Sequence, residues 1–441
     1  MKGEESVRTP MRIAVIGSGY VGTTLAAGFA DMNHDVTAVD IDEAIVKTLN
    51  AGESPIHEPG LGGIIARTAG ESLTATTDYT AITDAQLVFI AVQTPTTADG
   101  SINTDALRAA TIEAVDTLVA GSERPDGHVI VIKSTVTPPN LAALREDVES
   151  RTSGSDIDIE LASNPEFLRE GSAVADFSAP DKIVFGIDSK RAGDWLEQAF
   201  EPIIATKSPD VIRTDPETAS MIKYANNAFL AAKISVINDI GNICKEFGID
   251  AYVVAEAIGT DHRISPEFLR SGVGFGGSCF PKDVRALIAE AAQAGYHAPL
   301  LDATVELNEE QPTRMVSLLE KHLNPAGARV AVLGLAFKPG TDDIRNSRSI
   351  PLIEALKKRG AQVVAYDPVA TPPMRERFPE IEYANSAAGA LDGADAALVM
   401  TAWDEFGALD TEFDTMTRPI VVDGRRIIER RDGITYEGLT W

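Results

Sequence analysis

The chain opens with an apolar run that ends in glycine. Residues 12–17 are rich in β-branched side chains and predict a buried strand. A helical pattern follows over 21–32, and a second apolar run over 35–40 ends in Asp40. Strand, helix and strand within about 30 residues form a βαβ unit, so the sequence predicts a parallel sheet. Further strands are expected at 87–92, 129–133, 160–163 and 182–186.

The middle of the chain follows a helical period. Apolar residues recur at helical spacing over 218–246, a stretch without proline and with one glycine, Gly241. Such a helix is long for a globular domain. We expect it to join two α/β halves and to offer an apolar surface for self-association. Further helices are expected over 252–258, 281–294 and 299–323.

The opening pattern returns in the last third of the chain. Residues 329–334 predict a strand closed by glycine, 350–359 a helix, and 362–367 a strand that ends in Asp. Later strands are expected at 396–401 and 420–423. The predicted fold class is α/β, with two Rossmann-like doubly wound domains joined by a central long-helix region. The second domain lacks the full glycine signature of the first.

Length and charge limit the function classes. The 441 residues exceed one ordinary core, so two or three domains are expected. With 66 acidic and 39 basic residues the net charge is −27, which disfavours nucleic acid and anionic membranes as partners outside local basic pockets. The acid is spread along the chain. This pattern resembles the surfaces of halophilic proteins from salt-rich cytoplasm; an ordinary acidic enzyme is the alternative.

The sequence predicts neither a membrane span nor a secretory signal. It has no run of about 18 apolar residues, and the charged residues 1–10 are expected to form a flexible tail. Because Cys244 and Cys279 are the only cysteines, a disulfide framework is not expected, and a reducing cytoplasm fits best.

A glycine loop joins the first predicted strand to the first helix. Gly17, Gly19 and Gly22 have the spacing that allows a tight turn, a close approach of the backbone to a pyrophosphate, and close packing of helix on strand. The N–H groups that begin the helix suit phosphate. Asp40 ends the next strand, where a carboxylate binds both ribose hydroxyls and repels a 2′-phosphate. The sequence therefore predicts NAD rather than NADP as cofactor; a purely structural turn is the alternative.

Beyond this loop, ordered motifs cover nearly the whole chain. As they stand here, they are Gly-Ser-Gly-Tyr-Val-Gly (17–22), Asn-Ala-Gly-Glu-Ser-Pro-Ile-His-Glu-Pro-Gly-Leu (50–61), Thr-Pro-Thr (94–96), Ser-Thr-Val (134–136), Asn-Pro-Glu-Phe-Leu-Arg-Glu-Gly (164–171), Lys-Tyr-Ala-Asn-Asn (223–227), Gly-Phe-Gly-Gly-Ser-Cys-Phe-Pro-Lys-Asp (274–283) and Phe-Lys-Pro-Gly-Thr-Asp-Asp-Ile-Arg (337–345). By these motifs the sequence resembles the UDP-glucose/GDP-mannose dehydrogenase family, and its UDP-glucose branch in particular.

The resemblance implies an activity and a domain plan. The activity is a four-electron oxidation of UDP-glucose at C6 to UDP-glucuronate, with two NAD⁺ per sugar and with a cysteine thiohemiacetal and thioester as intermediates. GDP-mannose and other nucleotide sugars are the alternative substrates. The domains are expected to be an NAD-binding domain at 11–208, a central helical and dimerisation region at 209–322, and a domain at 323–441 that binds the UDP-sugar.

The cysteine of the 274–283 motif is the candidate nucleophile. A second hydride can leave an aldehyde carbon only after a nucleophile has made that carbon tetrahedral, which a thiolate does well. Pro281 favours the first position of a helix, and the partial positive charge of that helix N-terminus favours the thiolate of Cys279. Cys244 lies within an apolar helical pattern and is expected to be core.

Four further side chains are expected at the reacting centre. Lys223 and Asn227, at i and i+4, share one helix face. By resemblance they reach the reacting hydroxyl and the thiohemiacetal, with the lysine stabilising a developing oxyanion. Asp283 is the expected partner of a water or of Lys223 in a general-base relay, and Glu166 is the other candidate to assist a base or orient the hydrolytic water. The division of acid–base roles among Lys223, Asp283 and Glu166 stays open.

The resemblance also implies contacts to cofactor and substrate, and it implies no metal ligand. Cofactor contacts are expected at Gly17, Gly19, Tyr20, Val21, Gly22, Asp40, Thr94, Thr135, Glu170, Lys282 and Arg345. Substrate contacts are expected at Glu166, Phe167, Leu168, Lys223, Asn227, Arg263, Phe275, Gly276, Phe337, Lys338 and Arg425.

Two positions depart from the family pattern, and a third position, Arg263, implies an assembly of subunits. Ile45 stands where many relatives carry a basic residue, which implies a missing adenine-side or phosphate contact. Gln93 stands where glycine is common before Thr-Pro-Thr, which implies a small local change. In relatives the arginine that matches Arg263 comes from a neighbouring subunit, so a homodimer is the smallest expected active unit.

Overall fold

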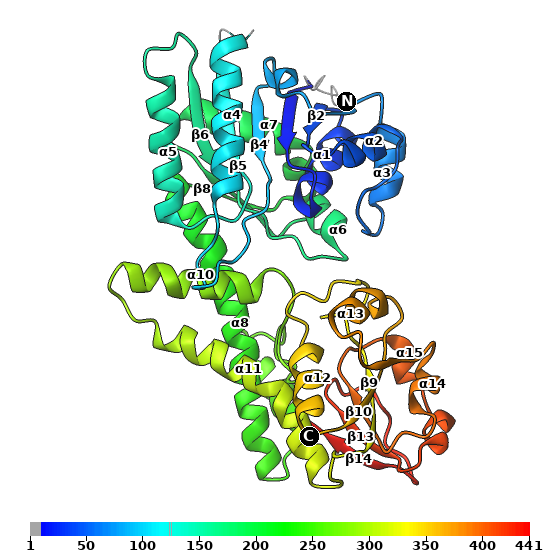
Figure 1. Cartoon of the computed structure of the whole chain (residues 1–441). Coiled ribbons are helices and arrows are strands. Elements are labelled where there is room, and N and C mark those ends of the chain that lie inside the picture. The colour runs from blue at the N-terminus through cyan, green and yellow to red at the C-terminus, as the bar shows by residue number, and fades with distance from the viewer. Residues whose placement is uncertain (1–9, 123, 125) are drawn as a thin grey trace, which may run out of the picture. The chain divides into compact units, whose positions relative to one another are not determined.

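The computed structural model describes residues 10–441 with the exception of 123 and 125. The chain forms two compact units, one that ends at Ala225 and one that runs from Asn226 to Trp441 (Figure 1). Apart from Pro10, the tail expected for residues 1–10 lies outside the described residues. The domain boundaries expected at 208 and 322 remain a prediction.

The first unit is built on an eight-stranded sheet. Neighbouring strands pair in parallel except at one junction, where Ser163 of β6 pairs antiparallel with Gly186 of β7. In their order across the sheet, the strands are β3 (Leu73–Thr76), β2 (Asp35–Val39), β1 (Arg12–Ile16), β4 (Leu87–Ile90), β5 (His128–Ile132), β6 (Ile159–Ser163), β7 (Lys182–Gly186) and β8 (Asp210–Thr214).

Helices pack on this sheet around an aromatic centre. The ring of Phe29 lies 5.2 Å from that of Phe89 and 5.1 Å from that of Phe200, and these rings join strand and helix side chains in one core. The Phe29–Phe200 pair is edge-on and the Phe29–Phe89 pair is tilted, and such rings bury a large apolar area. The helices are α1 (Tyr20–Asp31), α2 (Glu43–Asn50), α3 (Leu61–Thr68), the 3₁₀ turn η1 (Tyr79–Ile82), α4 (Asp105–Gly121), α5 (Pro138–Thr152), α6 (Ala173–Ser178) and α7 (Lys190–Lys207).

The second unit contains a six-stranded parallel sheet with a core on each face. Val330 and Val332 pack in one core and Ala331 and Leu333 in the other, because successive side chains of a strand point to opposite faces. Both faces are therefore covered, as is usual in doubly wound folds. Across the sheet the strands are β11 (Glu382–Tyr383), β10 (Gln362–Tyr366), β9 (Arg329–Leu333), β12 (Ala396–Val399), β13 (Ile420–Asp423) and β14 (Thr435–Gly438).

A long helix connects the two units in sequence. This helix, α8 (Pro216–Glu246), has 31 residues and crosses the boundary at Ala225. The remaining helices of the second unit are α9 (Ala251–Gly259), α10 (Phe280–Gln293), α11 (Pro299–Glu320), α12 (Ser349–Lys358), α13 (Thr371–Arg377), α14 (Ala387–Leu391), α15 (Asp404–Gly407) and the 3₁₀ turn η2 (Thr411–Thr415).

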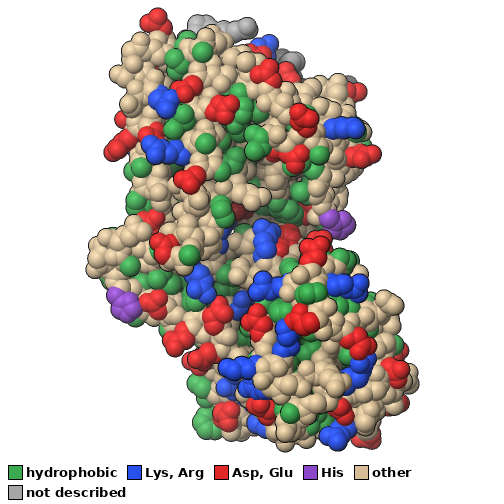
Figure 2. All heavy atoms as spheres, in the orientation of Figure 1, with side chains coloured by type: hydrophobic (Ala, Val, Ile, Leu, Met, Phe, Trp, Pro, Cys, Tyr) green, Lys and Arg blue, Asp and Glu red, His purple; other side chains and the backbone are tan. Residues whose placement is uncertain are grey.

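The predicted fold class is confirmed: two parallel-dominated α/β sheets with a helical middle. The ends of the predicted elements differ from the observed ones by three residues or fewer. In the described part of the chain, no helix combines the length and the apolar character that a membrane span requires. Figure 2 shows acidic side chains scattered over the face drawn, with basic ones among them.

Candidate active site

The glycine loop between β1 and α1 forms a tight turn. Gly17 has a φ of 93°, and its N–H donates to Val39 O at 2.8 Å; this left-handed backbone favours glycine. A Cβ on Gly22 would lie 1.8 Å from Gly17 O, so a side chain there would push α1 away from β1. A Cβ on Gly19, the N-cap of α1, would meet no described atom within 4 Å. The loop is packed at its two outer glycines and open at the middle one.

Two predicted cofactor contacts lie at the carboxyl ends of strands next to this loop. Asp40 follows β2, and its carboxylate accepts from the N–H groups of Ser18 at 2.5 Å and Asp42 at 3.0 Å. Thr94 follows β4 and donates its hydroxyl to Thr135 O, past the end of β5, at 2.8 Å. Ligands of doubly wound sheets bind at the carboxyl ends of the strands, where these residues lie.

A buried carboxylate holds the loop that follows β6. Glu58 is 6% exposed and accepts from the N–H groups of Gly171 and Ala173, each at 2.8 Å. The hydroxyl of Tyr20, which precedes Val21 at the start of α1, accepts from the same Gly171 N–H at 2.6 Å. The segment tied down in this way carries four predicted site residues: Glu166, Phe167, Leu168 and the half-buried Glu170.

A buried ion pair joins this loop to α8 within the first unit. Lys223 Nζ and Glu166 Oε1 lie 2.7 Å apart, with side chains 4% and 7% exposed. Burial alone raises the pKa of Glu166, but the Lys223 ammonium and hydrogen bonds from Lys223 and from the Leu168 N–H hold that pKa below its ordinary value. The ammonium groups of Lys182 and Lys223 lie 4.5 and 5.5 Å from the centre of the Phe167 ring. Glu166 is therefore an ionised carboxylate held by a cation.

In the second unit, Cys279 begins α10. It is the N-cap residue, and its carbonyl accepts from the Asp283 N–H at 2.8 Å. Helix α10 begins at Phe280, so Pro281 is its second residue and not its first as the sequence predicted; helix ends commonly shift by one residue. Cys279 is partly exposed, whereas Cys244 is buried, as predicted.

The loop before α10 has its main chain held by amide side chains. Asn308 of α11 accepts from the Phe275 N–H at 2.7 Å and donates to Phe275 O at 3.0 Å, as a neighbouring strand would. Asn346 donates to Gly277 O at 3.0 Å. A Cβ on Gly276 would lie 2.4 Å from Asn346 O, so the loop approaches too closely for a side chain there. Phe275 and Gly276 are thus fixed in place.

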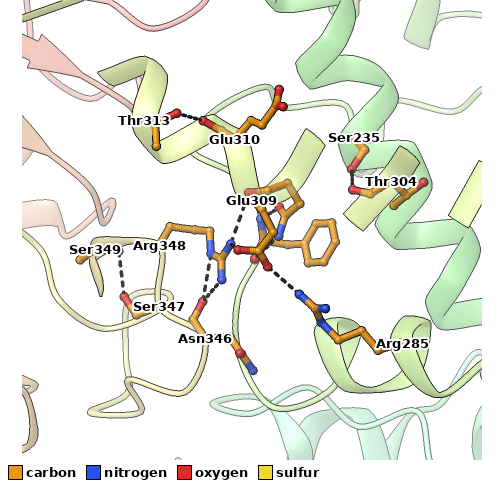
Figure 3. A network of polar contacts seen from close by, with 12 residues as sticks. Ser235, Arg285, Thr304, Glu309, Glu310, Thr313, Asn346, Ser347, Arg348 and Ser349 are labelled. Atoms are coloured by element: carbon orange, nitrogen blue, oxygen red, sulfur yellow. Dashed lines mark hydrogen bonds and ion pairs between the residues drawn. The ribbon is translucent and has the colours of Figure 1, made fainter. Parts of the chain in front are cut away.

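Arg348 lies behind this brace. It is 6% exposed, donates to Asn346 O through two guanidinium nitrogens at 3.0 and 2.9 Å, and donates to Asn308 O at 3.3 Å. Figure 3 shows its guanidinium beside Glu309, whose carboxylate also accepts from Arg285 at 2.8 Å. Arg348 therefore fixes both residues whose amides hold the cysteine loop.

Asp283 has a partner on each carboxylate oxygen. It is 1% exposed; Oδ2 accepts from Asn227 Nδ2 and Oδ1 from Lys282 Nζ, each at 2.6 Å. Asn227 lies on the portion of α8 that belongs to the second unit. The pairing of Asp283 with Lys223 that the sequence analysis considered would join the two units, and it remains a prediction.

A cavity of about 730 Å³ lies in the second unit. Its size is that of a site for a small organic ligand. It is lined by residues of α9 including Tyr252, by the segment 266–270, and by Arg425 and Arg426 after β13. Arg426 pairs with Asp250 at 2.6 Å and lies 4.4 Å from the centre of the Tyr252 ring. The cavity combines cationic and aromatic walls.

Asp423 presents the two arginines to this cavity. It ends β13, is fully buried, and accepts from the four successive N–H groups of residues 425–428 at 2.8 to 2.9 Å. Arg425 donates through Nε to Met400 O at 2.7 Å, and burial lowers the pKa of Arg425 to about 10. Its guanidinium remains a cation at neutral pH, held in a drier environment than a surface arginine.

The aspartate that directly follows β10 has different partners from Asp40. Asp367 is 2% exposed and accepts from the N–H groups of Leu335 and Ala336 at 2.7 and 3.1 Å and from Trp403 Nε1 at 3.0 Å. Its hydrogen-bonding capacity is thus used within the domain. This explains why the second doubly wound domain needs no glycine signature for a dinucleotide.

The remaining predicted contacts divide between the cysteine loop and the surface. The ring of Phe337 lies against Gly277, where a Cβ would come within 2.8 Å of it, and Lys338 Nζ lies 5.5 Å from the centre of that ring. Arg263 and Arg345 instead pair with their neighbours Asp261 and Asp343, with side chains 77% and 61% exposed.

Models of three domains of one family match successive parts of the chain. The NAD-binding domain of the UDP-glucose/GDP-mannose dehydrogenase family matches residues 11–204, its central domain 217–310 and its UDP-binding domain 331–430. The chain belongs to this family. It is an NAD-dependent oxidoreductase of nucleotide sugars, as the glycine loop and the motifs predicted.

Known proteins of this family match this chain over nearly its whole length. A UDP-glucose 6-dehydrogenase of Haloferax volcanii is 55% identical over 434 residues, which are 97% of this chain and 100% of the relative. The structure of a UDP-glucose dehydrogenase from Pyrobaculum islandicum is similar with a TM-score of 0.91 and 36% identity, and covers 99% of both chains. A UDP-D-ManNAc dehydrogenase from Pyrococcus horikoshii is similar with a TM-score of 0.84 and 26% identity, over 98% of this chain and 99% of the other.

The glycine loop fits the NAD of this family. The space beside Gly19 leaves room for a close approach to the backbone, and no side chain among the described residues caps α1 there. The first N–H groups of a helix bind phosphate well when no side chain occupies them. Asp40 lies next to this loop, and its role as a ribose contact remains a prediction.

The residues that hold these loops were not predicted from the sequence. Glu58 stands within the 50–61 motif, which was a usable signal. Asn308 and Arg348 belong to no motif quoted above; Asn308 lies 33 residues from Phe275 in the chain, and Arg348 lies 40 residues from Asn308. Tyr252, in the cavity wall, has the pattern of an ordinary helix residue.

Substitution of two glycines should separate packing from cofactor binding. Gly22→Ala places a methyl group against Gly17 O, and we expect a loss of about 3 kcal/mol in the free energy of unfolding. Gly19→Ala has room, so stability should change by less than about 0.5 kcal/mol while NAD affinity falls about tenfold or more. Urea unfolding and NAD titration measure the two effects. Equal stability of the two variants would contradict the packing argument.

Substitution of Asn308 should loosen the cysteine loop. Asn308→Ala leaves the N–H and C=O of Phe275 without their partner, at a cost of about 2 to 4 kcal/mol in the free energy of unfolding. We also expect faster alkylation of Cys279 by iodoacetamide, measured by mass spectrometry of the intact protein. The exposed Asn324→Ala serves as control. An Asn308→Ala protein as stable as this control would show that the brace contributes nothing.

Proposed function

We propose that the protein oxidises UDP-glucose at C6 to UDP-glucuronate in two steps, with two NAD⁺ consumed per sugar. The observation that carries this proposal is Cys279, a partly exposed thiol at the N-cap of α10 on a loop whose main chain is braced on both sides. The names of the Haloferax and Pyrobaculum relatives support the choice of sugar.

The second-unit cavity supplies a binding site for the nucleotide. We assign the diphosphate to the arginines at its wall, led by Arg425, since guanidinium groups bind phosphate oxygens in pairs. Tyr252 and Phe268 offer rings against which a base can stack. Lys338 and Phe337, next to the cysteine loop, are assigned to the sugar side of the nucleotide.

The chemistry follows from what a thiol does to an aldehyde. Oxidation of the C6 alcohol gives an aldehyde, to which the Cys279 thiolate adds to form a thiohemiacetal; oxidation of this adduct gives a thioester. Water then attacks the thioester carbon, the C–S bond breaks, and the carboxylate and the thiol are released. NAD⁺, when bound, accepts the hydride removed in each oxidation. The thiol also retains the aldehyde between the two oxidations.

The charged residues have separable tasks in this proposal. Lys223 is a cation in a dry site and would stabilise the oxyanions that develop at C6. Glu166, ionised by that same lysine, would orient the water that hydrolyses the thioester and accept its proton. The Asp283 carboxylate accepts from the amide nitrogen of Asn227, so the side-chain oxygen of Asn227 faces away from that carboxylate. Asp283 is therefore assigned to orientation, and to the relay of a proton through Lys282.

We further propose a homodimer that works in a reducing cytoplasm, where Cys279 stays a thiol. Phe229, Val236 and Ile243 recur along α8 at intervals of seven residues and are 73%, 53% and 51% exposed, and Phe247, directly after the helix, is 73% exposed. An exposed apolar stripe at this spacing suits pairing with a second helix. The exposed Arg263 is available for a partner copy, as the family resemblance implied.

Product stoichiometry tests the thioester scheme. The wild-type protein with UDP-glucose should yield two NADH per sugar, measured by absorbance at 340 nm against chromatography of the sugar nucleotides. Cys279→Ser, whose alkoxide forms poorly at neutral pH, should lower acid formation by about 10³-fold or more. Cys244→Ser is the control and should keep the ratio of two. A ratio of one, or acid formation by Cys279→Ser close to wild type, would contradict the scheme; GDP-mannose oxidised in preference to UDP-glucose would change the substrate.

Charge placed on the stripe should separate the copies. Phe229→Glu together with Val236→Glu puts two carboxylates into the proposed interface, and we expect a monomer by analytical ultracentrifugation at micromolar protein. The control Val369→Glu changes a 43% exposed apolar residue elsewhere and should leave the dimer intact. An unchanged sedimentation coefficient in the double variant would contradict this interface.

A further inference from the structure

A second lysine lies buried near the Glu166–Lys223 pair. Lys133 directly follows β5 and is 6% exposed. Its Nζ donates to Asn164 Oδ1 at 2.8 Å. Asn164 in turn donates through Nδ2 to Val184 O at 2.9 Å, which fixes the amide so that its oxygen faces the lysine. The ammonium group therefore has a built position at the junction of β6 and β7.

One aromatic ring and the ion pair also lie near this amine. The ring of Phe200, from α7, lies 5.9 Å from Lys133 Nζ. The charged groups that act on the amine are Glu166, from the loop after β6, and Lys223, from α8. Burial lowers the pKa of Lys133 to about 7, with repulsion from Lys223 adding to this effect and attraction to Glu166 opposing it.

We propose that Lys133 is a positioning residue for the oxidation: a buried cation, oriented by Asn164, that keeps Glu166 ionised beside Lys223. This proposal rests on the proposed function, in which Glu166 and Lys223 act on the sugar. The described hydrogen bond of the Lys133 side chain goes to Asn164. It acts through the charge that it adds to the pair.

The sign of the effect depends on pH. Below neutral pH Lys133 is charged, and its field lowers the pKa of Glu166. As the pH rises through about 7 the amine becomes neutral, and this field disappears. An enzyme that needs an ionised Glu166 should therefore depend on Lys133 on the acid side of its pH profile and not on the alkaline side.

Two substitutions of opposite sign test this role. Lys133→Met keeps the length and removes the charge, so its kcat should match wild type at pH 8.5. The acid limb of its kcat profile should lie at a higher pH than that of wild type, because without the Lys133 charge the pKa of Glu166 moves up toward its ordinary value. Lys133→Arg keeps a charge at every pH. It should keep the acid limb of wild type, because the charge that acts on Glu166 is retained.

The control and the readouts separate charge from packing. Lys190→Met removes an exposed lysine that pairs with Asp194, and its profile should parallel that of wild type. Saturating UDP-glucose and NAD⁺ confine the comparison to kcat, and thermal unfolding at each pH verifies that the variants are folded. A loss of kcat in Lys133→Met that is equal at every pH, or an acid limb that coincides with that of wild type, would overturn the proposal.

A measurement on the unaltered protein keeps the proposal testable if the variants do not fold. Lysine labelled with ¹³C at Cε, followed by NMR from pH 5.5 to 9.5, should show one amine that titrates near neutral pH. A spectrum in which every lysine titrates above pH 9 would overturn the proposal. Wild-type turnover of UDP-glucose decides the proposed function separately, because failure there leaves the titration result unaffected.

Discussion

Main chain that leaves a strand or helix inside a protein still needs hydrogen-bond partners, and this constraint governs the functional loops of both units. Each loop is held by a buried side chain that takes the place of a neighbouring strand. Asp423 binds four successive N–H groups, Glu58 binds two across a turn, and Asn308 matches both polar groups of Phe275. The loops that carry Arg425, Glu166 and Cys279 can be irregular in shape and still well defined.

Hydrogen bonds to a carboxylate also distinguish the two doubly wound domains from each other. Asp40 and Asp367 each follow the second strand of a βαβ start, and both accept from their glycine turns. Asp40 has two N–H partners, whereas Asp367 also binds Trp403 and the N–H groups of residues 369 and 370. A carboxylate saturated in this way holds its own turn but has little left for a ribose. The second domain therefore keeps the Rossmann-like frame and uses its loops to present cations and a ring.

The sequence predicted the frame well because apolar periodicity reports burial directly. Strands such as Lys182–Gly186 and Ile420–Asp423 match their predicted ranges in full. β3, with its mixed polar and apolar residues at a sheet edge, was not predicted, because an edge strand needs no apolar run. The cysteine was evident from its motif. Its brace was not, because Asn308 contacts Phe275 only once α11 has folded against the loop, and no local pattern encodes that contact.

Net charge and local charge act on different length scales in this protein. At −27 the chain repels an anionic nucleotide at long range, yet salt screens such a field within about 8 Å under physiological conditions. The cations that matter are buried or half-buried, where screening is weak: Arg425 at the cavity and Lys133 and Lys223 beside Glu166. Two buried ammonium groups beside one carboxylate exceed what that carboxylate can neutralise. Lys223 holds Glu166 directly at 2.7 Å, while Lys133 Nζ donates to the neutral amide of Asn164, and burial lowers the pKa of Lys133 to about 7.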